Sequence, residues 1–352
     1  MMSQPRRLVF ASSVDYARHT GGYVYNRRLM GELAARGWDV TPLDLPAGFP
    51  RPDGAARAQS AKLLATLPDG TLVVADQICF SPLAGTLAHE AARLRLVMLF
   101  HHPIAMEEGL RPDERAHFMA AERAALAACR LVIVSSRMTA QSLAAEYGVP
   151  PAQVVVALPG IDRRDAGEPR EGDVPRLLSV GAVIPRKGYD VLIEALAGLL
   201  HMPWRLDVVG DLDRAPDYAA ALRARIRRAG LDARVQLAGG LPQADLEACW
   251  GAAQVYVAAS MHEGYGMAVA EAIARGLPVV TTGAGAVGDW LDPAAALIVP
   301  ERSAAALRAA LARVLSEAEL RARLRSAALA QAARFPSWAD TAAAVDSRLA
   351  AR

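Results

Sequence analysis

The sequence predicts an α/β protein built from two doubly wound domains of similar size. Short apolar runs alternate with longer helical segments, which is the pattern of a parallel sheet with helices on both faces. This alternation stops at 163–175, a segment rich in charge, Gly and Pro, and then begins again. A chain of 352 residues is long enough for two domains of ordinary size.

The first half of the chain begins with the apolar run 7–12, which is predicted to be a strand. A polar loop leads to Gly21-Gly22, and the helix after it is expected to end before Gly37, because glycine is common just past a helix end. Pro, Gly and Asp fill 46–54 and indicate a loop. Further strands are expected at 38–43, 71–75, 94–100, 131–134 and 154–156. Helices are expected from after Gly22 to about 35 and at about 55–67, 111–128 and 138–147.

The second half repeats the same alternation after the predicted linker at 163–175. One continuous helix is predicted from 303 to 334, and Phe335-Pro336 then breaks it before a last helix at 337–349. Strands are expected at 176–180, 205–209, 235–238, 255–259, 277–282 and 296–299. These boundaries predict a first domain at 1–162, a second domain at 163–335 and a C-terminal helix within 336–352.

Composition narrows the class of protein. A formal charge of +2 gives no indication of a nucleic-acid partner, and a pI near 8.5 tolerates an anionic membrane surface without requiring one. Cys79, Cys129 and Cys249 are far apart and form no CxxC motif, so neither a disulfide framework nor a zinc site is expected. The first residues lack the apolar core of a signal peptide, and no apolar run reaches the length of a membrane span. We therefore expect a cytoplasmic protein.

The most informative stretch is SMHEGYGMAVAEAIARGLPVVTT, residues 260–282. It follows a predicted strand at 255–259 and continues with a turn at Glu263-Gly264-Tyr265-Gly266, where two glycines allow a tight corner. A helix is then expected from Met267 to Arg275, since Gly276 stands in the usual position just past a helix end.

Two carboxylates bracket the start of this helix. The amino end of a helix offers unpaired N–H groups and the positive end of the dipole, so it favours a bound anion. Glu263 can therefore reach hydroxyl groups of a ligand while the amides of Gly264 to Met267 face its phosphates, and Glu271 can touch a sugar hydroxyl further along. Taken singly, Glu263 can simply cap the helix and Glu271 can be a solvated surface group.

The spacing of these carboxylates resembles a known signature. Glu263 and Glu271 are separated by seven residues, with Gly-Tyr-Gly after the first and Ala-Arg-Gly-Leu-Pro-Val-Val after the second. This pattern resembles the retaining GT-B glycosyltransferases of the family 4 type. The resemblance implies two Rossmann-like domains facing across a cleft: an acceptor-side first domain and a second domain that binds a nucleotide-sugar donor. It also implies that the C-terminal helix packs back on the first domain.

A basic pair opens the second domain. Gly181 closes a strand, and Arg186-Lys187-Gly188 precedes a helix. An Arg fork beside a Lys point charge can clamp a diphosphate, and the same charges stabilise a departing nucleoside diphosphate. In isolation an exposed, solvated pair is the favoured interpretation. The resemblance implies that Arg186 and Lys187 bind the donor's phosphates.

Two further pairs lie in the first half of the chain. Gly21-Gly22 follows the first strand and His101-His102 ends another, where an ordinary turn and ordinary hydrogen-bonded side chains are the simple interpretations. A metal site would need a third ligand near the histidines, and the sequence shows none. The resemblance implies that the glycines lie beside the donor's phosphates and the acceptor. It also implies that one histidine contacts the donor sugar, and both remain candidates.

Other motifs are set aside or leave questions open. The stretch around Gly21-Gly22 is not GxGxxG, so a nicotinamide oxidoreductase is disfavoured. Asp211-Leu212-Asp213 is similar to the DxD metal motif of a different glycosyltransferase architecture, and the basic helix at 223–228 fits a solvated face. Asp289 stands where the family often has Glu, and Ala294-Ala295-Ala296 replaces its usual Asn-Gly. These departures leave the nucleotide base and the sugar open.

The expected function is a retaining, metal-independent transfer of a hexose from a nucleotide diphosphate sugar to a polysaccharide, lipid or small-molecule acceptor. The nucleotide sugar is a co-substrate, and neither a further cofactor nor a nucleic-acid partner is expected. The acceptor would enter near 13–25 and 101–110, and a peripheral contact with the inner face of a membrane is compatible with the charge. The candidate catalytic residues are Glu263, His101, His102, Arg186 and Lys187, and the candidate donor-binding residues are Gly21, Gly22, Gly181, Arg186, Lys187, Glu263, Gly264, Tyr265, Gly266, Met267 and Glu271.

Two points of this interpretation stay open at the level of sequence. Retention through a covalent intermediate would need a carboxylate nucleophile near the anomeric carbon, whereas the resemblance favours same-face attack with Glu263 positioning the sugar. The alternatives to a transferase are a GT-B epimerase or hydrolase of nucleotide sugars, and a non-catalytic protein that binds them.

Overall fold

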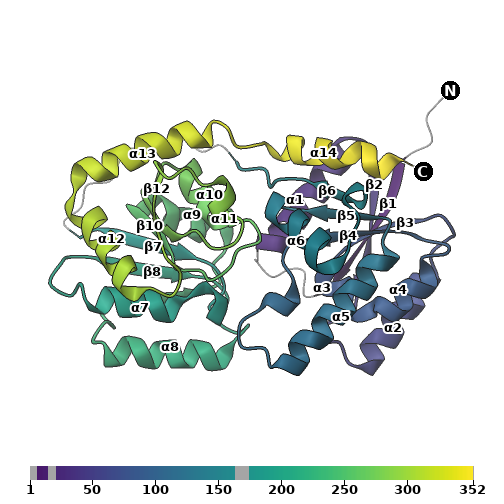
Figure 1. Ribbon diagram of the computed structural model, residues 1–352, viewed down its shortest axis with the longest axis horizontal. Helices are drawn as coiled ribbons and strands as arrows, with labels where there is room; N and C mark the ends of the chain where they lie inside the picture. Colours follow the sequence, from purple (N-terminus) through teal and green to yellow (C-terminus); the bar gives the residue numbers. More distant parts are fainter. Residues whose placement is uncertain (1–5, 15–20, 163–173, 352) are drawn as a thin grey trace. The chain divides into compact units, whose positions relative to one another are not determined.

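The computed structural model describes residues 6–14, 21–162 and 174–351 (Figure 1). The predicted linker at 163–175 lies almost wholly outside these residues, and so does most of the polar loop after the first strand. The chain divides into two compact units, residues 1–160 with 336–352, and residues 161–335. Each unit holds one parallel six-stranded sheet, so the predicted pair of doubly wound α/β domains is confirmed.

The sheet of the first unit has the strand order β2-β1-β3-β4-β5-β6, and all its neighbouring strands are parallel. The strands are β1 (Arg6–Ser13), β2 (Trp38–Leu45), β3 (Leu72–Asp76), β4 (Arg95–Phe100), β5 (Leu131–Val134) and β6 (Val154–Val156). The strand order reverses between β1 and β3. Ligands of doubly wound sheets bind outside the carboxyl ends of the strands at such a switch point.

The sheet of the second unit is built the same way, with the order β12-β11-β10-β7-β8-β9. Its strands are β7 (Arg176–Val180), β8 (Arg205–Val209), β9 (Val235–Gly239), β10 (Val255–Ala258), β11 (Val279–Thr282) and β12 (Ala296–Val299). Here the switch point lies between β7 and β10, which are hydrogen-bonded neighbours. The segments after these two strands are the ones that hold the predicted basic pair and Glu263.

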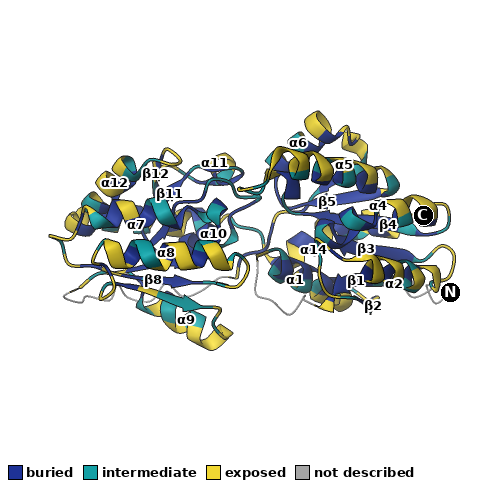
Figure 2. Ribbon diagram, turned by 90° about the horizontal axis from the view of Figure 1, so that it is seen from below, coloured by how far each residue is buried: buried dark blue, intermediate teal, exposed yellow. Residues whose placement is uncertain are grey.

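Helices cover both sheets, and Figure 2 shows buried residues along the strands and both buried and exposed residues along the helices. In the first unit they are α1 (Gly21–Ala35), α2 (Gly54–Ala65), α3 (Gln77–Phe80), α4 (Ala84–Glu90), α5 (Pro112–Ala128), α6 (Arg137–Tyr147) and α14 (Trp338–Ala350). In the second unit they are α7 (Tyr189–Ala197), α8 (Pro216–Arg228), α9 (Gln243–Ala252), α10 (Met267–Ala274), α11 (Val287–Trp290), α12 (Ala304–Ser316) and α13 (Ala318–Ala332).

The C-terminal helix α14 belongs to the first unit, where it packs against α1. The rings of Tyr25 and Trp338 meet edge to face with centroids 5.7 Å apart. Asp346 accepts hydrogen bonds of 2.7 Å from both Arg6 and the indole of Trp38. The unit boundary falls between Gly160 and Ile161, because the Ile161 side chain is buried in a cluster of the second unit.

The structure corrects two expectations about helices. The predicted helix at 303–334 is two helices, because the backbone of Glu317 is extended between α12 and α13. The break turns Leu320 and Leu324 back onto the core that also holds Leu311, so burial of apolar surface outweighs the local helical preference. Gly21 and Gly22 are the first two residues of α1 and not part of the loop before it. No helices were predicted between β3 and β4, where α3 and α4 lie.

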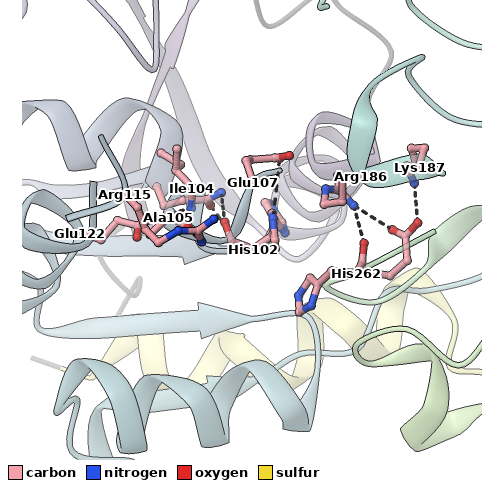
Figure 3. A network of polar contacts seen from close by, with 12 residues as sticks. His102, Ile104, Ala105, Glu107, Arg115, Glu122, Arg186, Lys187 and His262 are labelled. Carbon is pink, nitrogen blue, oxygen red and sulfur yellow. Dashed lines mark hydrogen bonds and ion pairs between the residues drawn. The ribbon is translucent and has the colours of Figure 1, made fainter. Parts of the chain in front are cut away.

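A buried carboxylate holds the turn after β4. Glu122 of α5 accepts a 2.5 Å hydrogen bond from the backbone N–H of Ile104 and a 3.0 Å bond from the hydroxyl of Tyr147. The guanidinium of Arg115 donates to the carbonyl of Ala105 in the same turn (Figure 3). Burial raises the pKa of Glu122 to about 7, although these hydrogen bonds act in the opposite direction.

Replacing Glu122 by Gln tests this arrangement. Between about pH 4.5 and about pH 7 the folded protein holds the Glu122 proton more tightly than the unfolded chain does, so this group lowers the free energy of unfolding as pH rises. Glu122→Gln keeps an acceptor for Ile104 and a donor for Tyr147 but cannot ionise. We expect urea titrations across this window to show a flatter pH dependence, by roughly 1 to 3 kcal/mol in total.

The matched control is Glu146→Gln, which changes an exposed carboxylate on α6. It should reproduce the wild-type slope. Equal slopes for the wild type and Glu122→Gln would contradict the assignment of a raised pKa to this side chain.

Candidate functional site

The switch point of the second unit brings a basic pair to a carboxylate. Arg186 and Lys187 lie in a 3-10 turn, Pro185–Lys187, that follows β7. Glu263 follows β10, the strand hydrogen-bonded to β7. Because the two strands are parallel neighbours, their carboxyl ends open at the same edge of the sheet, and residues 76 positions apart in sequence come into contact.

The three side chains form one ion cluster. The Nζ of Lys187 lies 2.6 Å from Oε1 of Glu263, and Nη1 of Arg186 lies 3.6 Å from Oε2. Arg186 also donates a 2.6 Å hydrogen bond to the carbonyl of His262 (Figure 3). The side chains of Arg186, Lys187 and Glu263 are only 11%, 18% and 12% exposed. The interpretation of Arg186-Lys187 as an exposed, solvated pair is therefore wrong.

The electrostatics of the cluster fix the charge of Glu263. Burial acts to raise its pKa, but the charges of Lys187 and Arg186, helped by hydrogen bonds from Lys187 and Ser260, outweigh burial and hold the pKa at about 2. Glu263 is therefore ionised at neutral pH. Two cations share this single carboxylate, so the cluster keeps an excess of positive charge.

Close backbone contacts hold the loops that carry these side chains. A Cβ on Gly188 would lie 2.1 Å from the carbonyl oxygen of Ala259, and one on Gly285 would lie 2.3 Å from the carbonyl oxygen of Glu263. The N–H of Ala286 donates to that same carbonyl over 2.9 Å. Glycine is therefore required at both positions, and the loop after β11 supports Glu263 through its backbone.

Ser260 is a site residue that was not predicted from the sequence. Its hydroxyl donates a 2.6 Å hydrogen bond to Oε1 of Glu263, and its carbonyl accepts a 2.5 Å bond from Thr282 on β11. A polar residue at the end of an apolar strand was the available signal, since such residues lie at the ligand edge of a parallel sheet.

The start of α10 lies next to the cluster in sequence. Gly266 has a left-handed backbone (φ 88°) and precedes Met267, the first helical residue. The ring of Tyr265 is buried and stacks on Trp290 at 5.3 Å, and the Trp290 indole donates to the carbonyl of Tyr265. The Tyr265 ring thus braces the turn. Glu271 lies in the second turn of α10 and is half-buried.

The switch point of the first unit gathers a second group of predicted residues. A Cβ on Gly22 would lie 3.1 Å from Cδ2 of the His101 ring, so α1 begins in contact with this histidine. His102 makes a different contact, with Nε2 3.7 Å from a carboxylate oxygen of Glu107 (Figure 3). The two histidines that the sequence left equivalent therefore have different surroundings.

Behind His101 lie two polar residues that the sequence analysis missed. Nε2 of His101 is 2.7 Å from Oδ1 of Asn26, and the amide nitrogen of Asn26 is 3.3 Å from Oδ2 of Asp76. Asn26 and Asp76 are buried. Asp76 ends β3, and its position at a strand end was the sequence signal that could have identified it.

The other motifs lie elsewhere in the second unit. Asp211 accepts a 2.8 Å hydrogen bond from the backbone N–H of Asp213 and so forms a local turn. Asp289 is exposed on α11, and helix α8 buries Leu222 and Ile226 while Arg223 is exposed. Across the described parts of the chain, none of the helices is both long enough and apolar enough to cross a membrane.

Comparison with protein families matches both halves of the chain. The model described as Glycosyltransferase Family 4 matches residues 56–165. The model described as Glycosyl transferases group 1 matches residues 161–331. The second match contains every residue of the ion cluster.

Relatives of known name are similar over most of the chain. The D-inositol 3-phosphate glycosyltransferase of Xylanimonas cellulosilytica is 30% identical over 297 residues, which are 78% of this chain and 70% of that protein. The enzyme of the same name from Kineococcus radiotolerans is 30% identical over 272 residues, 68% of this chain and 61% of that protein. The MMP alpha-(1->4)-mannosyltransferase of Mycolicibacterium hassiacum is 29% identical over 321 residues, 84% and 74% of the two chains.

Solved structures share the fold of the whole chain. Sucrose-phosphate synthase from Thermosynechococcus elongatus superposes with a TM-score of 0.80 at 20% identity, over 97% of this chain and 98% of that one. The Anabaena protein HepE in complex with UDP and glucose gives a TM-score of 0.76 at 18% identity, over 98% and 99%. At such identity the likeness establishes the GT-B fold alone. Together with the family matches and the relatives, it shows that the chain belongs to the family 4 type of glycosyltransferases, the glycosyl transferases group 1.

Proposed function

We propose that the protein is a retaining, metal-independent glycosyltransferase that moves a hexose from a nucleoside diphosphate sugar to a hydroxyl-bearing acceptor. The observation that carries the proposal is the ion cluster of Arg186, Lys187 and Glu263 at the switch point of the second unit. Such an edge is where doubly wound sheets bind ligands, and this cluster brings two cationic side chains to it.

The basic pair suits the diphosphate. Lys187 donates to Glu263, and an incoming phosphate would compete with that carboxylate for the same ammonium group. Arg186 presents a planar fork of donors beside it, which matches phosphate oxygens. As the glycosidic bond breaks, negative charge grows on the leaving phosphate, and two nearly buried cations stabilise it without a metal ion.

Glu263 suits the hydroxyl groups of the sugar. An ionised carboxylate is an acceptor only, so it binds O–H donors and repels phosphate. A carboxylate whose pKa is about 2 is a weak base and a weak nucleophile. This property supports a positioning role in same-face attack, with the leaving phosphate taking the acceptor's proton, over a covalent intermediate on Glu263.

The remaining candidates complete the proposed donor site. Gly181 and the amides of Gly264 to Met267 would lie along the diphosphate, and Glu271 would hold the ribose. From the first unit, Gly21-Gly22 would lie near the phosphates and His101 near the sugar. The HepE structures contain UDP, glucose or UDP-glucose, and the named relatives are glycosyltransferases, which supports a nucleotide-sugar donor.

The acceptor is proposed by class only, as a polysaccharide, a lipid or a small molecule. The names of the relatives mention inositol 3-phosphate and mannosyl transfer, which makes a small phosphorylated alcohol the first acceptor to try. Residues 101–110 of the first unit would border the acceptor. Hydrolysis of the donor without any acceptor would favour the hydrolase alternative.

Binding of a nucleotide panel tests the donor site. UDP, GDP, ADP and dTDP, alone and as sugar conjugates, are compared by thermal unfolding. A ligand at a hundred times its Kd adds about 2.7 kcal/mol and raises the Tm by a few degrees. We expect one nucleotide to stand out and Lys187→Ala to lose most of that shift, because the variant lacks one of the two diphosphate cations.

The matched control is Lys62→Ala, since Lys62 is the only other lysine of the chain and is exposed on α2. It should behave as the wild type does. If no nucleotide raises the Tm, or if the shift persists in Lys187→Ala, the assignment of the diphosphate site is wrong.

Glu263→Ala separates binding from transfer. The variant loses the acceptor for the sugar's hydroxyls but frees Lys187 from its intramolecular partner. We therefore expect transfer to fall at least about 100-fold, on the scale of a lost transition-state contact, while the unsubstituted nucleoside diphosphate binds as tightly as in the wild type or more tightly. Isothermal titration and initial rates measure the two effects.

Circular dichroism checks that Glu263→Ala is folded, because removing one partner of a buried ion pair is destabilising. Wild-type turnover in this variant would contradict the role of Glu263. Loss of nucleotide binding together with turnover would show that the carboxylate supports the phosphate site instead of the sugar.

A further inference from the structure

Three polar side chains meet at the switch point of the first unit. Asn26 extends from α1, Asp76 ends β3, and His101 follows the last residue of β4. β3 and β4 are hydrogen-bonded neighbours, with Asp76 opposite Leu99. Asn26 is fully buried and Asp76 is 2% exposed, so each needs its hydrogen bonds satisfied within the protein.

Asp76 determines which way the amide of Asn26 is turned. Oδ1 of Asp76 accepts a 3.0 Å hydrogen bond from the N–H of Cys79, and Oδ2 faces Nδ2 of Asn26 at 3.3 Å. An ionised carboxylate only accepts, so the reverse orientation would set the amide oxygen of Asn26 against it. Burial raises the pKa of Asp76 to about 6, and the group is mostly ionised above that pH.

The orientation of Asn26 in turn determines the tautomer of His101. With Nδ2 directed to Asp76, the amide oxygen is left for Nε2 of His101 at 2.7 Å. An amide oxygen cannot donate, so Nε2 must carry the hydrogen. In a neutral imidazole this leaves Nδ1 with a lone pair, able to accept a hydrogen bond.

The surroundings of the ring keep it neutral and fixed. Burial lowers the pKa of His101 to about 4. The Tyr25 ring packs edge to face against it at 5.0 Å, and a Cβ on Gly22 of the same helix would lie only 3.1 Å from its Cδ2. The backbone N–H of His101 donates to the side chain of Gln77, which follows Asp76. The ring of His101 is thus held by side chains and backbone of α1, and its backbone is held by Gln77, the residue after β3.

We propose that Asn26 and Asp76 are positioning residues for the transfer reaction, which fix His101 as the neutral Nε2–H tautomer so that Nδ1 accepts a hydrogen bond from a hydroxyl group of the donor sugar. The proposal rests on the function proposed above and deepens it. A neutral acceptor nitrogen binds an O–H donor and has nothing to offer a phosphate. The substrate group that His101 recognises is therefore a neutral hydroxyl.

Asp76→Asn is the variant that tests the proposal. Asn is as good a helix N-cap as Asp, so the cap of α3 is retained. The new amide can donate to Asn26, which lets Asn26 turn over and present its own N–H₂ to Nε2 of His101. We expect the tautomer to change to Nδ1–H, with Nδ1 no longer an acceptor.

The tautomer is read directly by ¹⁵N NMR of histidine-labelled protein at pH 7.5. His101 is one of seven histidines, and loss of its signals in His101→Gln assigns it. The wild type should show a neutral ring protonated at Nε2, and Asp76→Asn should show a ring protonated at Nδ1. The control Asp69→Asn alters a carboxylate that is 83% exposed and should leave the spectrum unchanged.

Kinetics connect the tautomer to the reaction. We expect Asp76→Asn to lower kcat about 10- to 100-fold with little change in nucleotide affinity or Tm, on the scale of one acid–base or hydrogen-bonding contact. Asn26→Leu removes the hydrogen-bonded connection, or relay, between Asp76 and His101. Adding Asp76→Asn to Asn26→Leu should therefore cause no further loss of kcat. Such non-additivity distinguishes one relay from two independent structural effects.

Several outcomes would overturn the proposal. They are a wild-type His101 protonated at Nδ1 or at both nitrogens at pH 7.5, an unchanged tautomer in Asp76→Asn, or a changed tautomer with wild-type kcat. The NMR experiment needs no turnover, so the relay is tested even if no glycosyl transfer is found. Failure of the nucleotide panel would instead count against the donor site itself.

Discussion

The buried ion cluster of Arg186, Lys187 and Glu263 is the interaction on which the second unit's functional edge depends. Each charge is largely removed from water, so the loss of Glu263 would deprive two largely buried cations of the carboxylate that they share. The cluster therefore requires the segments after β7 and β10 to stay together. The close contact of these segments also requires glycine at 188 and 285, because a side chain at either position would overlap a neighbouring backbone.

The first unit also has a group of polar side chains at the carboxyl edge of its sheet, but that group has no net cationic charge. There Asn26 is hydrogen-bonded to both Asp76 and His101. These hydrogen bonds fix which atoms donate and which accept, whereas the ion cluster of the second unit sets the local electrostatic potential. In the second unit the charged groups follow β7 and β10, the strands that flank the reversal of strand order. In the first unit Asp76 ends β3, which flanks the reversal, and His101 follows the neighbouring strand β4.

Much of the fold could be predicted because the central strands are short apolar runs bounded by polar residues. β5, β6, β7, β8 and β12 have the predicted ends, and the other strands differ by a residue or two. The prediction of helix boundaries was wrong where tertiary packing, and not local sequence, decides where a helix ends. The Ala-rich run at 303–334 has no Gly or Pro to mark a break, yet it divides at Glu317 because Leu320 and Leu324 bury themselves only if the chain turns there. The short helices between β3 and β4 were likewise too brief for a periodic signal.

The sequence by itself determined the two doubly wound domains, the family and the main charged residues of the site. Arg186, Lys187 and Glu263 each lie in a local motif whose spacing is readable along the chain. Only the tertiary structure decided which groups touch. Both Lys187 and Ser260 donate hydrogen bonds to Glu263. His101, and not His102, lies against Gly22. Asn26 and Asp76 are hydrogen-bonded to each other behind the His101 ring. The physical reason is that hydrogen bonds and ion pairs act over about 3 Å, whereas partners such as Lys187 and Glu263 are 76 positions apart in sequence. They meet only because parallel strands bring distant loops to one edge of the sheet.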